Sequence, residues 1–276
     1  MTIEPGSLID LQMVGAEKWG LHLFEEIIKA FYRKILIPGD QVVDGGANAG
    51  LHTIPLAEAV GEHGRVLAFE PIPCLVESLM KTLNERNIKN VQIRQTALSL
   101  RHGTAKFHWL KNRAAESSLS NARIDPAQDE VESFDVTTVR LDDILPTTFD
   151  RCRFIKLDLE GAEFDALRGA RQCLLRDRPT VILEFGYHAA AQAWGYDQAE
   201  WDAFYDAVGY RLYDLVGRPL LHRPWGELGS YIWYLIAVPK DSSDESLVLD
   251  GLMDEVAPIA KEWSLAMAEG RLPRSA

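Results

Sequence analysis

The chain has 276 residues, enough for one large α/β domain with additions, and its 47% hydrophobic and 25% charged residues exclude a disordered or fibrous protein. Its formal charge of -12 at pH 7 opposes binding to a phosphate backbone, so we expect no nucleic acid partner. The three cysteines have no CxxC spacing, which argues against a disulfide scaffold or a zinc site.

The first predicted element is an amphipathic helix over residues 16–35. Its apolar residues recur at steps of three and four, as they do on one face of a helix: Trp19, Leu23, Ile27, Ala30, Phe31 and Ile35. We treat residues 1–38 as an N-terminal helical cap. Residues 1–10 carry no basic stretch followed by an apolar run, and no uncharged segment has the length of a membrane span. We therefore expect a cytoplasmic protein without a membrane span.

Alternating strands and helices follow Pro38-Gly39-Asp40. The spacing predicts, in order, a strand over 41–44, a helix over 51–60, a strand over 65–70, a helix over 73–86 and a strand over 91–95. Short strands are also predicted over 107–109 and 134–139. The polar residues 112–132 between them predict a long active-site loop.

The alternation then resumes to the end of a domain that we place at residues 39–240. It comprises a strand over 154–159, a helix over 162–175, a strand over 180–185, a helix over 201–208 and strands over 210–216 and 231–238. A loop rich in Gly and Pro joins the last two as an antiparallel pair. We expect a Rossmann-like, doubly wound, mostly parallel seven-stranded sheet with an antiparallel strand near the C-terminus. Residues 241–276 form a helical extension or tail, with a helix over 249–267.

The segment Asp44-Gly45-Gly46-Ala47-Asn48-Ala49-Gly50 turns from a strand into a helix through glycines. Backbone without β-carbons lets a ligand lie against such a turn, although a tight turn alone would also use these glycines. The segment departs from the GxGxxG pattern of dinucleotide sites, which makes a nicotinamide cofactor the second choice. Glu70 ends the next strand about twenty residues on, where a carboxylate can accept hydrogen bonds from both ribose hydroxyls.

The predicted strand over 154–159 ends in alternating charges. Lys156, Asp158 and Glu160 share one face if the strand continues through them. Charges in an apolar strand are unfavourable unless they pair with one another or reach a ligand. A structural salt-bridge cluster and a ligand site are both compatible with this pattern.

Taken together, six segments resemble the FkbM-type methyltransferase family: VDGGANAG, FEP, SSL, VRLDDI, IKLDLEGAE and ILEFG, between residues 42 and 186. The resemblance implies a Rossmann-like methyltransferase fold that uses S-adenosylmethionine, chiefly for O-methylation of hydroxyls on polyketide, sugar or glycolipid products. The family pattern implies a short serine loop at Ser117-Ser118-Leu119 over the cofactor or acceptor, although a plain turn fits equally well. Asp142 in LDDI is expected to cap the helix that it precedes.

Carried over by position, the resemblance assigns cofactor-binding residues to each part of S-adenosylmethionine. The methionine end would be held by Asp44, Gly45, Gly46, Asn48 and Gly50, the ribose by Glu70 and the adenine by Ala97. Asp158 counts among the cofactor-binding residues and, with Glu160, would face the methyl-transfer site.

A hydroxyl acceptor is a weak nucleophile at neutral pH and needs a group that takes up its proton. Asp158, Glu160, His52 and His188 are the candidates, with Asp158 first because its strand end points at the ligand site. His52 has the alternative of a structural role at a helix start. No metal is assigned, although a divalent ion on Asp158, Glu160 and Glu184 is a metal-assisted alternative.

The acceptor is expected to be a small molecule, and N-methylation remains an alternative to O-methylation. A nicotinamide-dependent oxidoreductase and a noncatalytic nucleoside-binding protein are the rival classes. Aromatic residues gather in the last third of the chain, where they either line an acceptor cleft or fill a core: Trp194, Tyr196, Trp201, Tyr205, Tyr213, Trp225, Tyr231 and Trp233. These aromatics and the N-terminal helix could also supply the interface of a homo-oligomer.

Overall fold

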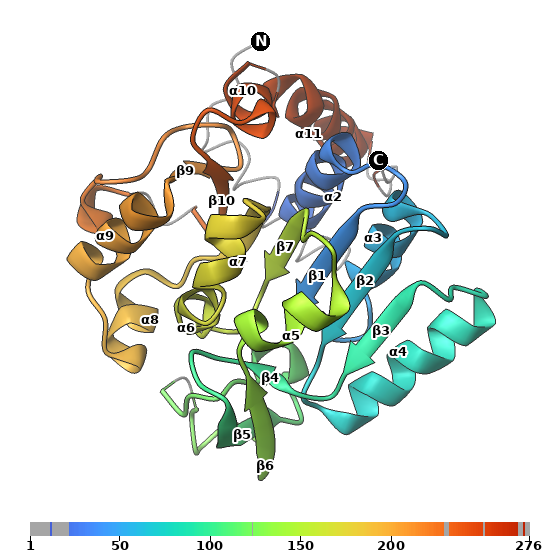
Figure 1. The fold of residues 1–276 in the computed structure, drawn as a ribbon, viewed down its shortest axis with the longest axis vertical. Coiled ribbons are helices and arrows are strands. Elements are labelled where there is room, and N and C mark those ends of the chain that lie inside the picture. Colours follow the sequence, from blue (N-terminus) through green and yellow to red (C-terminus); the bar gives the residue numbers. More distant parts are fainter. Residues whose placement is uncertain are drawn as a thin grey trace.

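A seven-stranded sheet forms the centre of the protein (Figure 1). The computed structural model describes residue 12, residues 22–122, 124–228, 232–250 and 252–269, and residue 273. Across the sheet the strands are β3 (Val91–Arg94), β2 (Arg65–Phe69), β1 (Gln41–Gly45), β7 (Phe154–Leu157), β8 (Thr180–Glu184), β10 (Tyr234–Pro239) and β9 (Tyr210–Asp214). All neighbours from β3 to β8 are parallel, and β10 runs antiparallel to both β8 and β9. The predicted fold class is confirmed.

Each strand packs on both faces because its successive side chains point to opposite sides. Val42 of β1 belongs to the hydrophobic cluster on one face of the sheet, whereas its neighbour Val43 belongs to the cluster on the other. Phe154 and Ile155 of β7 divide in the same way. The run of apolar residues in each strand is therefore explained by burial on both sides.

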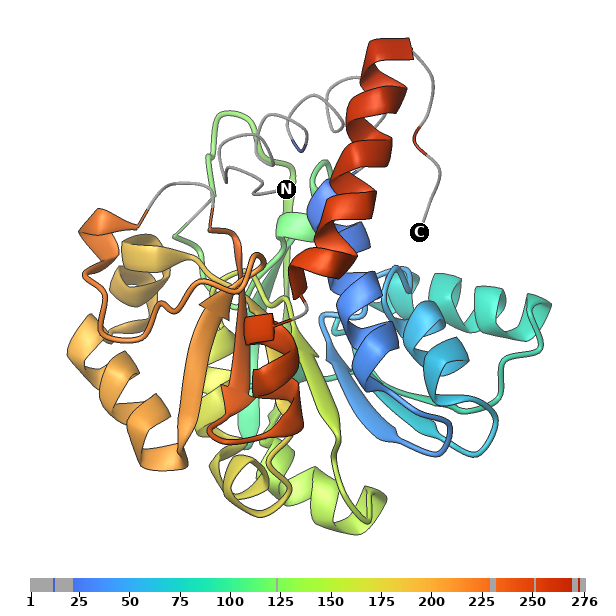
Figure 2. The ribbon, with the colours of Figure 1, turned by 90° about the horizontal axis from the view of Figure 1, so that it is seen from above.

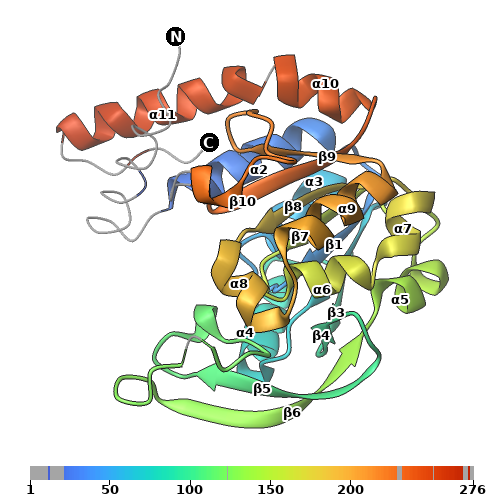
Figure 3. The ribbon, with the colours of Figure 1, turned by 90° about the vertical axis from the view of Figure 1, so that its left-hand side faces the viewer.

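Helices cover both faces (Figure 3). On one side lie α2 (Leu23–Ile35), α3 (Thr53–Val60), α4 (Pro73–Glu85), α10 (Ser243–Asp250) and α11 (Leu252–Glu269). On the other lie α5 (Leu141–Thr148), α6 (Glu163–Arg168), α7 (Arg171–Arg176), α8 (Tyr187–Trp194) and α9 (Gln198–Val208). Among the helices of the described residues, none combines the length and apolarity needed to cross a bilayer.

A second sheet lies at the carboxyl edge of the first and was not predicted (Figure 3). Its strands are β4 (Ala97–Leu98), β6 (Val131–Val139) and β5 (Gly103–Leu110), in that order, and β5 and β6 pair as a long antiparallel hairpin. The strand predicted over 107–109 is part of β5, and the strand predicted over 134–139 is the last two thirds of β6. The expected loop over 112–132 is shorter, because it contains the 3₁₀ helix η1 (Ala114–Glu116) and the start of β6.

Several predicted elements begin or end at other residues in the structure than the sequence indicated, and three of these differences matter here. The strand expected to reach residue 159 ends at Leu157, so the inference that Glu160 continues its face is wrong; Glu160 lies in a turn with φ +54°. The helix expected over 162–175 is divided at Gly169, where an added β-carbon would lie 2.3 Å from the Ser99 carbonyl oxygen. Tight packing there interrupts the helix. The single helix expected over 249–267 is instead α10 and α11, and α10 begins within the acidic stretch.

Asp142 does not cap the helix that it begins. Its carboxylate accepts hydrogen bonds from the backbone of Gln172 (3.0 Å) and Cys173 (2.9 Å), in the first turn of α7. Asp142 therefore caps a helix, as predicted, but the capped helix is α7 and not α5. Its backbone partner Gln172 lies thirty residues further along the chain, so the sequence around Asp142 could not indicate it.

The helices at the two ends of the chain pack in one hydrophobic cluster on the same face of the sheet (Figure 2). Phe31 of α2 and Trp263 of α11 are both buried in it, together with Val42 and Ile236 of the sheet. The division at residues 38 and 240 stays a prediction, as does the part of the first helix before residue 22, which lies outside the described residues.

Candidate active site

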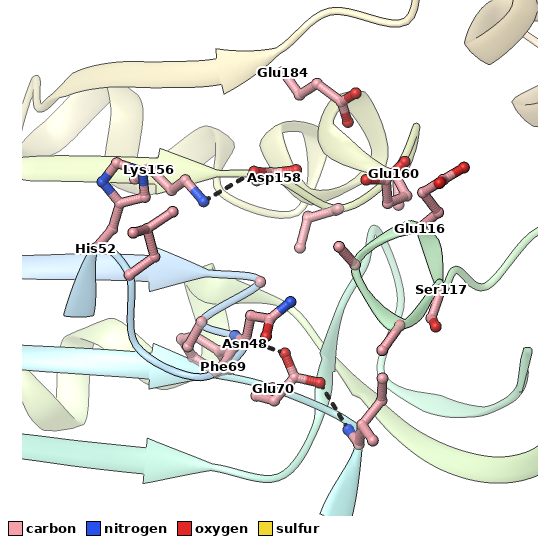
Figure 4. A pocket seen from close by; sticks show the side chains of 18 of the residues that line it. Asn48, His52, Phe69, Glu70, Glu116, Ser117, Lys156, Asp158, Glu160 and Glu184 are labelled. Carbon is pink, nitrogen blue, oxygen red and sulfur yellow. Dashed lines mark hydrogen bonds and ion pairs between the residues drawn. The ribbon is translucent and has the colours of Figure 1, made fainter. Parts of the chain in front are cut away.

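A cavity of about 720 Å³ opens beyond the carboxyl ends of the parallel strands (Figure 4). This edge is where open α/β sheets bind their ligands, and the volume suits a cofactor or a small substrate. The loops after β1, β2, β3 and β7 line it, together with Phe107 of β5 and the 3₁₀ helix η1. The predicted site residues among its lining are Asn48, Gly46, His52, Glu70, Ala97, Ser117, Asp158, Glu160 and Glu184.

Gly46 makes the turn after β1 possible. Its φ is +78°, and an added β-carbon would lie 1.9 Å from the backbone oxygen of Asp158. The backbone N–H groups of Gly46 and Ala47 both donate to the Phe69 carbonyl, at 3.0 and 2.9 Å. The turn is therefore wedged between the ends of β2 and β7, and only a residue without a side chain fits there.

Asp44, Gly45 and Gly50 support this turn from outside the cavity lining. Asp44 is fully buried and accepts a hydrogen bond from the Thr53 hydroxyl at 2.5 Å. Its other oxygen, Oδ1, has no hydrogen-bond partner among the described residues. Gly50 has φ +99°, which a side chain would strain. Their direct contact with the methionine end of a cofactor stays a prediction.

Glu70 stands at the rim between β2 and the second sheet. Its Oε2 accepts the backbone N–H of Asn48 at 2.9 Å, and its Oε1 accepts that of Ile72 at 2.8 Å. Burial raises the pKa of this carboxyl to about 7, against the two N–H groups, which lower it. Ala97, Ile72 and Phe107 form an apolar wall beside it.

A chain of polar contacts forms the deep end of the cavity. Lys156 Nζ lies 3.2 Å from Asp158 Oδ2, and the Tyr234 hydroxyl lies 3.2 Å from the same oxygen. That hydroxyl is also 3.0 Å from Glu25 Oε1, and the other oxygen of Glu25 pairs with Nε2 of His52. Five groups from five separate elements or loops thus form one connected network.

Two members of this network, Lys156 and Glu25, are held in their charged forms by their surroundings. Burial lowers the pKa of Lys156, but the carboxylates of Asp158, Asp44 and Glu25 outweigh burial and raise it. Burial likewise raises the pKa of Glu25, but hydrogen bonding and charge interaction with His52, together with Lys156, bring it down to about 2. Lys156 is therefore an ammonium and Glu25 a carboxylate at neutral pH.

Three carboxylates converge beside this network. One oxygen each from Asp158, Glu160 and Glu184 lies within 4.8 Å of the others. The turn that carries the first two is held by Glu163, whose carboxylate accepts the backbone N–H of Leu159 at 2.6 Å. Oxygen ligands at this spacing are compatible with a hard divalent cation.

The serine loop is tied to the same turn. The Ser118 hydroxyl donates to the Glu160 carbonyl oxygen at 3.1 Å, and Ser117 Oγ accepts the backbone N–H of Leu110 at 3.0 Å. Ser117 and Leu119 line the cavity. The loop is thus a wall of the cavity anchored to its carboxylate side.

His188 is the predicted proton acceptor that the structure does not bring to the cavity. It is exposed on α8, with its ring 5.3 Å from that of Trp225, and is absent from the lining. The aromatic residues of the last third divide between the two expected roles. Trp201 and Trp225 are buried in the core, whereas Trp233 is 38% exposed and lines the cavity. Tyr231 lies outside the described residues.

Sequence reasoning missed Glu25 and Tyr234. Glu25 is an acidic residue in the first turn of an amphipathic helix, where a solvated carboxylate is common. Nothing in the sequence around it therefore indicated a place in the cavity. Tyr234 could have been found from strand register, because it lies opposite Glu184 at the carboxyl edge. The contact between them and His52 depends on how α2 packs.

Comparison with known proteins gives a family match. A family model described as Methyltransferase FkbM domain matches residues 44–212. Methyltransferase 1 of Beauveria bassiana is 27% identical over 161 residues, which cover 52% of this chain and 64% of that protein. Methyltransferase sdnD of Sordaria araneosa is 27% identical over 154 residues, which cover 46% of this chain and 59% of that protein. The chain therefore spans less than two thirds of the length of either relative.

Solved structures resemble the chain more distantly. Methyltransferase FkbM from Methylobacillus flagellatus KT superposes with a TM-score of 0.47 at 15% identity, and covers 84% of this chain and 58% of that one. The family match includes the glycine turn, Glu70 and the turn after β7, but it begins after α2 and ends before β10.

Proposed function

The chain belongs to the FkbM methyltransferase family, and on that premise we propose that it transfers a methyl group from S-adenosylmethionine to a hydroxyl of a small-molecule acceptor. The observation that carries the proposal is the position of Glu70. This carboxylate is fixed by two backbone N–H groups at the rim of the cavity, beside the glycine turn and an apolar wall.

The residues present fit this cofactor. The two oxygens of Glu70 each hold one backbone N–H and keep lone pairs for the two ribose hydroxyls. The wall beside it, with Ala97 and Phe107, suits the flat face of adenine. Gly46 lines the cavity and allows the tight turn beside which the methionine end would lie. Oδ1 of Asp44, which has no hydrogen-bond partner among the described residues, is a further acceptor in the strand before that turn.

When bound, S-adenosylmethionine supplies an electrophilic methyl group on a sulfonium. The chain must then orient the acceptor in line with that methyl group, exclude water and take up the acceptor's proton. The cavity's depth and its apolar rim serve the first two tasks. The carboxylates of Asp158 and Glu160, and the imidazole of His52, are the groups available for the third.

Oxygen is proposed as the methylated atom because the family resemblance implies it and because the cavity holds proton acceptors that a hydroxyl would need. N-methylation is the alternative. A cytoplasmic location, a homo-oligomeric state and the absence of a nucleic acid partner stay predictions.

Calorimetric titration with S-adenosylhomocysteine and, separately, with NAD tests the cofactor. We expect S-adenosylhomocysteine to bind at a one-to-one ratio and NAD to show no saturable heat. Tight binding of NAD alone would overturn the proposal in favour of an oxidoreductase. A catalytically inactive binding protein would bind S-adenosylhomocysteine yet transfer no methyl group to any hydroxylated compound.

The convergence of Asp158, Glu160 and Glu184 favours a second version in which a divalent ion acidifies the acceptor hydroxyl. The ammonium of Lys156 beside Asp158 works against a further cation there. Exhaustive chelation distinguishes the versions: activity that survives it removes the metal, and activity lost and then restored by magnesium supports it.

A further inference from the structure

His52 is a buried side chain with one nitrogen held and the other unused. It is 3% exposed at the start of α3, and its Nε2 pairs with the Glu25 carboxylate. Its Nδ1 is buried and has no hydrogen-bond partner among the described residues, yet the residue lines the cavity. A buried polar atom without a partner is unfavourable by itself. A ligand in the cavity would supply the partner that Nδ1 lacks.

The contact with Glu25 determines which nitrogen carries the proton. A carboxylate can only accept, so in the neutral imidazole the proton sits on Nε2 and the lone pair remains on Nδ1. The ammonium of Lys156 also favours the ionised form of Glu25. An imidazole oriented in this way by a carboxylate is a prepared proton acceptor.

The neighbouring carboxylate Asp158 is less suited to this task. Its Oδ2 already lies 3.2 Å from the ammonium of Lys156 and 3.2 Å from the hydroxyl of Tyr234, which it shares with Glu25. This oxygen is therefore already engaged by other groups. Nδ1 of His52 has no such competing partner in the part of the chain that the structure describes.

We propose that Nδ1 of His52 takes up the proton of the acceptor hydroxyl, and that Glu25, from outside the family-matched segment, is the positioning residue that holds the imidazole for it. The proposal rests on the proposed function. As the acceptor oxygen forms its bond to the methyl carbon, the carbon–sulfur bond breaks and sulfur keeps its electron pair. The O–H proton passes to Nδ1, and the resulting imidazolium lies against the Glu25 carboxylate.

The surroundings favour this charge change. The groups around the Glu25–His52 pair are Tyr32 on α2, whose ring lies 5.9 Å from that of His52, Lys156 on β7, and Tyr234 on β10, which also contacts Asp158. Asp44 on β1 acts on Tyr32 and Lys156. Burial raises the pKa of Tyr32, so it stays neutral. The imidazolium that forms in the step has its counter-charge in the Glu25 carboxylate, which pairs with its Nε2.

Nitrogen-15 spectra of the histidine rings test the orientation, with His52 assigned from the signal lost in His52→Gln. The expected wild-type form at neutral pH carries the proton on Nε2. Glu25→Gln, whose amide can donate as well as accept, should no longer fix the proton on Nε2. The matched control is Glu26→Gln, because Glu26 is the next residue of α2 and pairs with Lys29; it should leave the tautomer unchanged. A proton on Nδ1 in the wild type, or an unchanged single tautomer in Glu25→Gln, would overturn the inference.

Phenol, with anisole as its counterpart without the hydroxyl, tests whether a ligand reaches Nδ1. With S-adenosylhomocysteine bound, phenol should shift the Nδ1 resonance and anisole should not; equal shifts, or none, count against the inference. If Glu25→Gln does not fold, Glu25→Asp keeps a carboxylate acceptor and should keep the proton on Nε2. Calorimetry on the same samples separates the two proposals: failure of the wild type to bind S-adenosylhomocysteine defeats the proposed function, whereas normal binding with the wrong tautomer defeats only this inference.

Discussion

At the scale of single residues, two positions shape the end of the cavity where we propose that the cofactor binds. Gly46 brings the turn after β1 against the backbone of Asp158, and Glu70 faces the cavity with both oxygens already held by backbone N–H groups. Both act through geometry that another side chain cannot reproduce. Their substitution therefore has effects that can be predicted separately.

Gly46→Ala should destabilise the fold by about 2–4 kcal/mol, because it adds a backbone clash to an unfavourable φ. Gly195→Ala is the matched control: its φ is +69°, but no atom lies within 4 Å of the added β-carbon. It should lose only about 1 kcal/mol. Urea unfolding measures both, and equal losses would show that the close approach to Asp158 is unimportant.

Glu70 predicts a pH dependence of cofactor binding. In the proposed complex, ribose hydroxyls would donate to the ionised carboxylate, and burial raises the pKa of this carboxyl to about 7. Affinity for S-adenosylhomocysteine should therefore rise up to tenfold per pH unit below 7 and level off above it. Glu70→Gln should bind about 10–100-fold more weakly, with no such dependence. The exposed Glu85→Gln should behave as wild type. Calorimetry between pH 6 and 8 decides, and a pH-dependent Glu70→Gln variant would contradict the assignment.

The same raised pKa has a consequence for stability. The folded chain holds this proton more tightly than the unfolded chain, whose carboxyl titrates near 4.5. Ionisation of Glu70 therefore reduces the free energy of unfolding as pH rises from about 4.5 to 7, in the absence of cofactor.

At the scale of elements, the strand ends explain which site residues could be predicted. Asp44 lies near the carboxyl end of β1, and Glu70 and Asp158 directly follow β2 and β7. The carboxyl ends of parallel strands meet at one edge of the sheet, so the convergence of these residues follows from the βαβ pattern. The hairpin β5–β6 could not be recognised in full, because polar residues such as Lys106, His108 and Asp135 interrupt its apolar pattern. These side chains find partners across the two strands, in the Lys106–Asp135 and His108–Ser133 contacts, only after the strands have paired.

The deep end of the cavity depends on contacts distant in sequence. Glu25 meets His52 across 27 residues and Tyr234 across 209. Nothing local distinguishes Glu25 from Glu26, which pairs with Lys29. The difference arises only when the apolar stripe of α2 packs against the sheet and turns one of the two inward.

The amino ends of the strands are held by a different ion pair. Arg153 at β7 contacts both oxygens of Asp244 on α10, at 2.6 and 2.8 Å, and donates to the Ile35 carbonyl at the end of α2. This guanidinium joins three elements that are far apart in sequence.

Asp244→Asn should lower the free energy of unfolding by about 3 kcal/mol, because it leaves the largely buried Arg153 without its counter-charge. Affinity for S-adenosylhomocysteine should be unchanged, since the pair lies at the edge opposite the cavity. Glu85→Gln, in the exposed pair with Lys81, should change stability by less than about 0.5 kcal/mol. Denaturant titration would refute the role of the buried pair if both variants lost the same amount.

At the scale of the whole molecule, the two ends of the chain complete the core of the central sheet. Trp263 of α11 is 2% exposed and packs in the cluster that contains α2. Trp263→Ala should destabilise the protein by about 3–5 kcal/mol. Leu265→Ala, on the same helix but 45% exposed, should change stability by about 0.5 kcal/mol or less. Thermal unfolding followed by circular dichroism measures both, and similar melting temperatures would mean that α11 is not part of the cooperative core.

The residues that line the cavity come from inside and from outside the family-matched segment. The glycine turn, Glu70 and the turn after β7 lie inside the family-matched segment, whereas Glu25, Trp233 and Tyr234 lie outside it on α2 and beside β10. Mutations in these outer segments can therefore change the end of the cavity lined by Glu25 and Tyr234 while the matched segment keeps its sequence. Under the proposed function, two chains with the same motifs could then differ in the acceptor that they take. A comparison confined to those motifs would group such chains together.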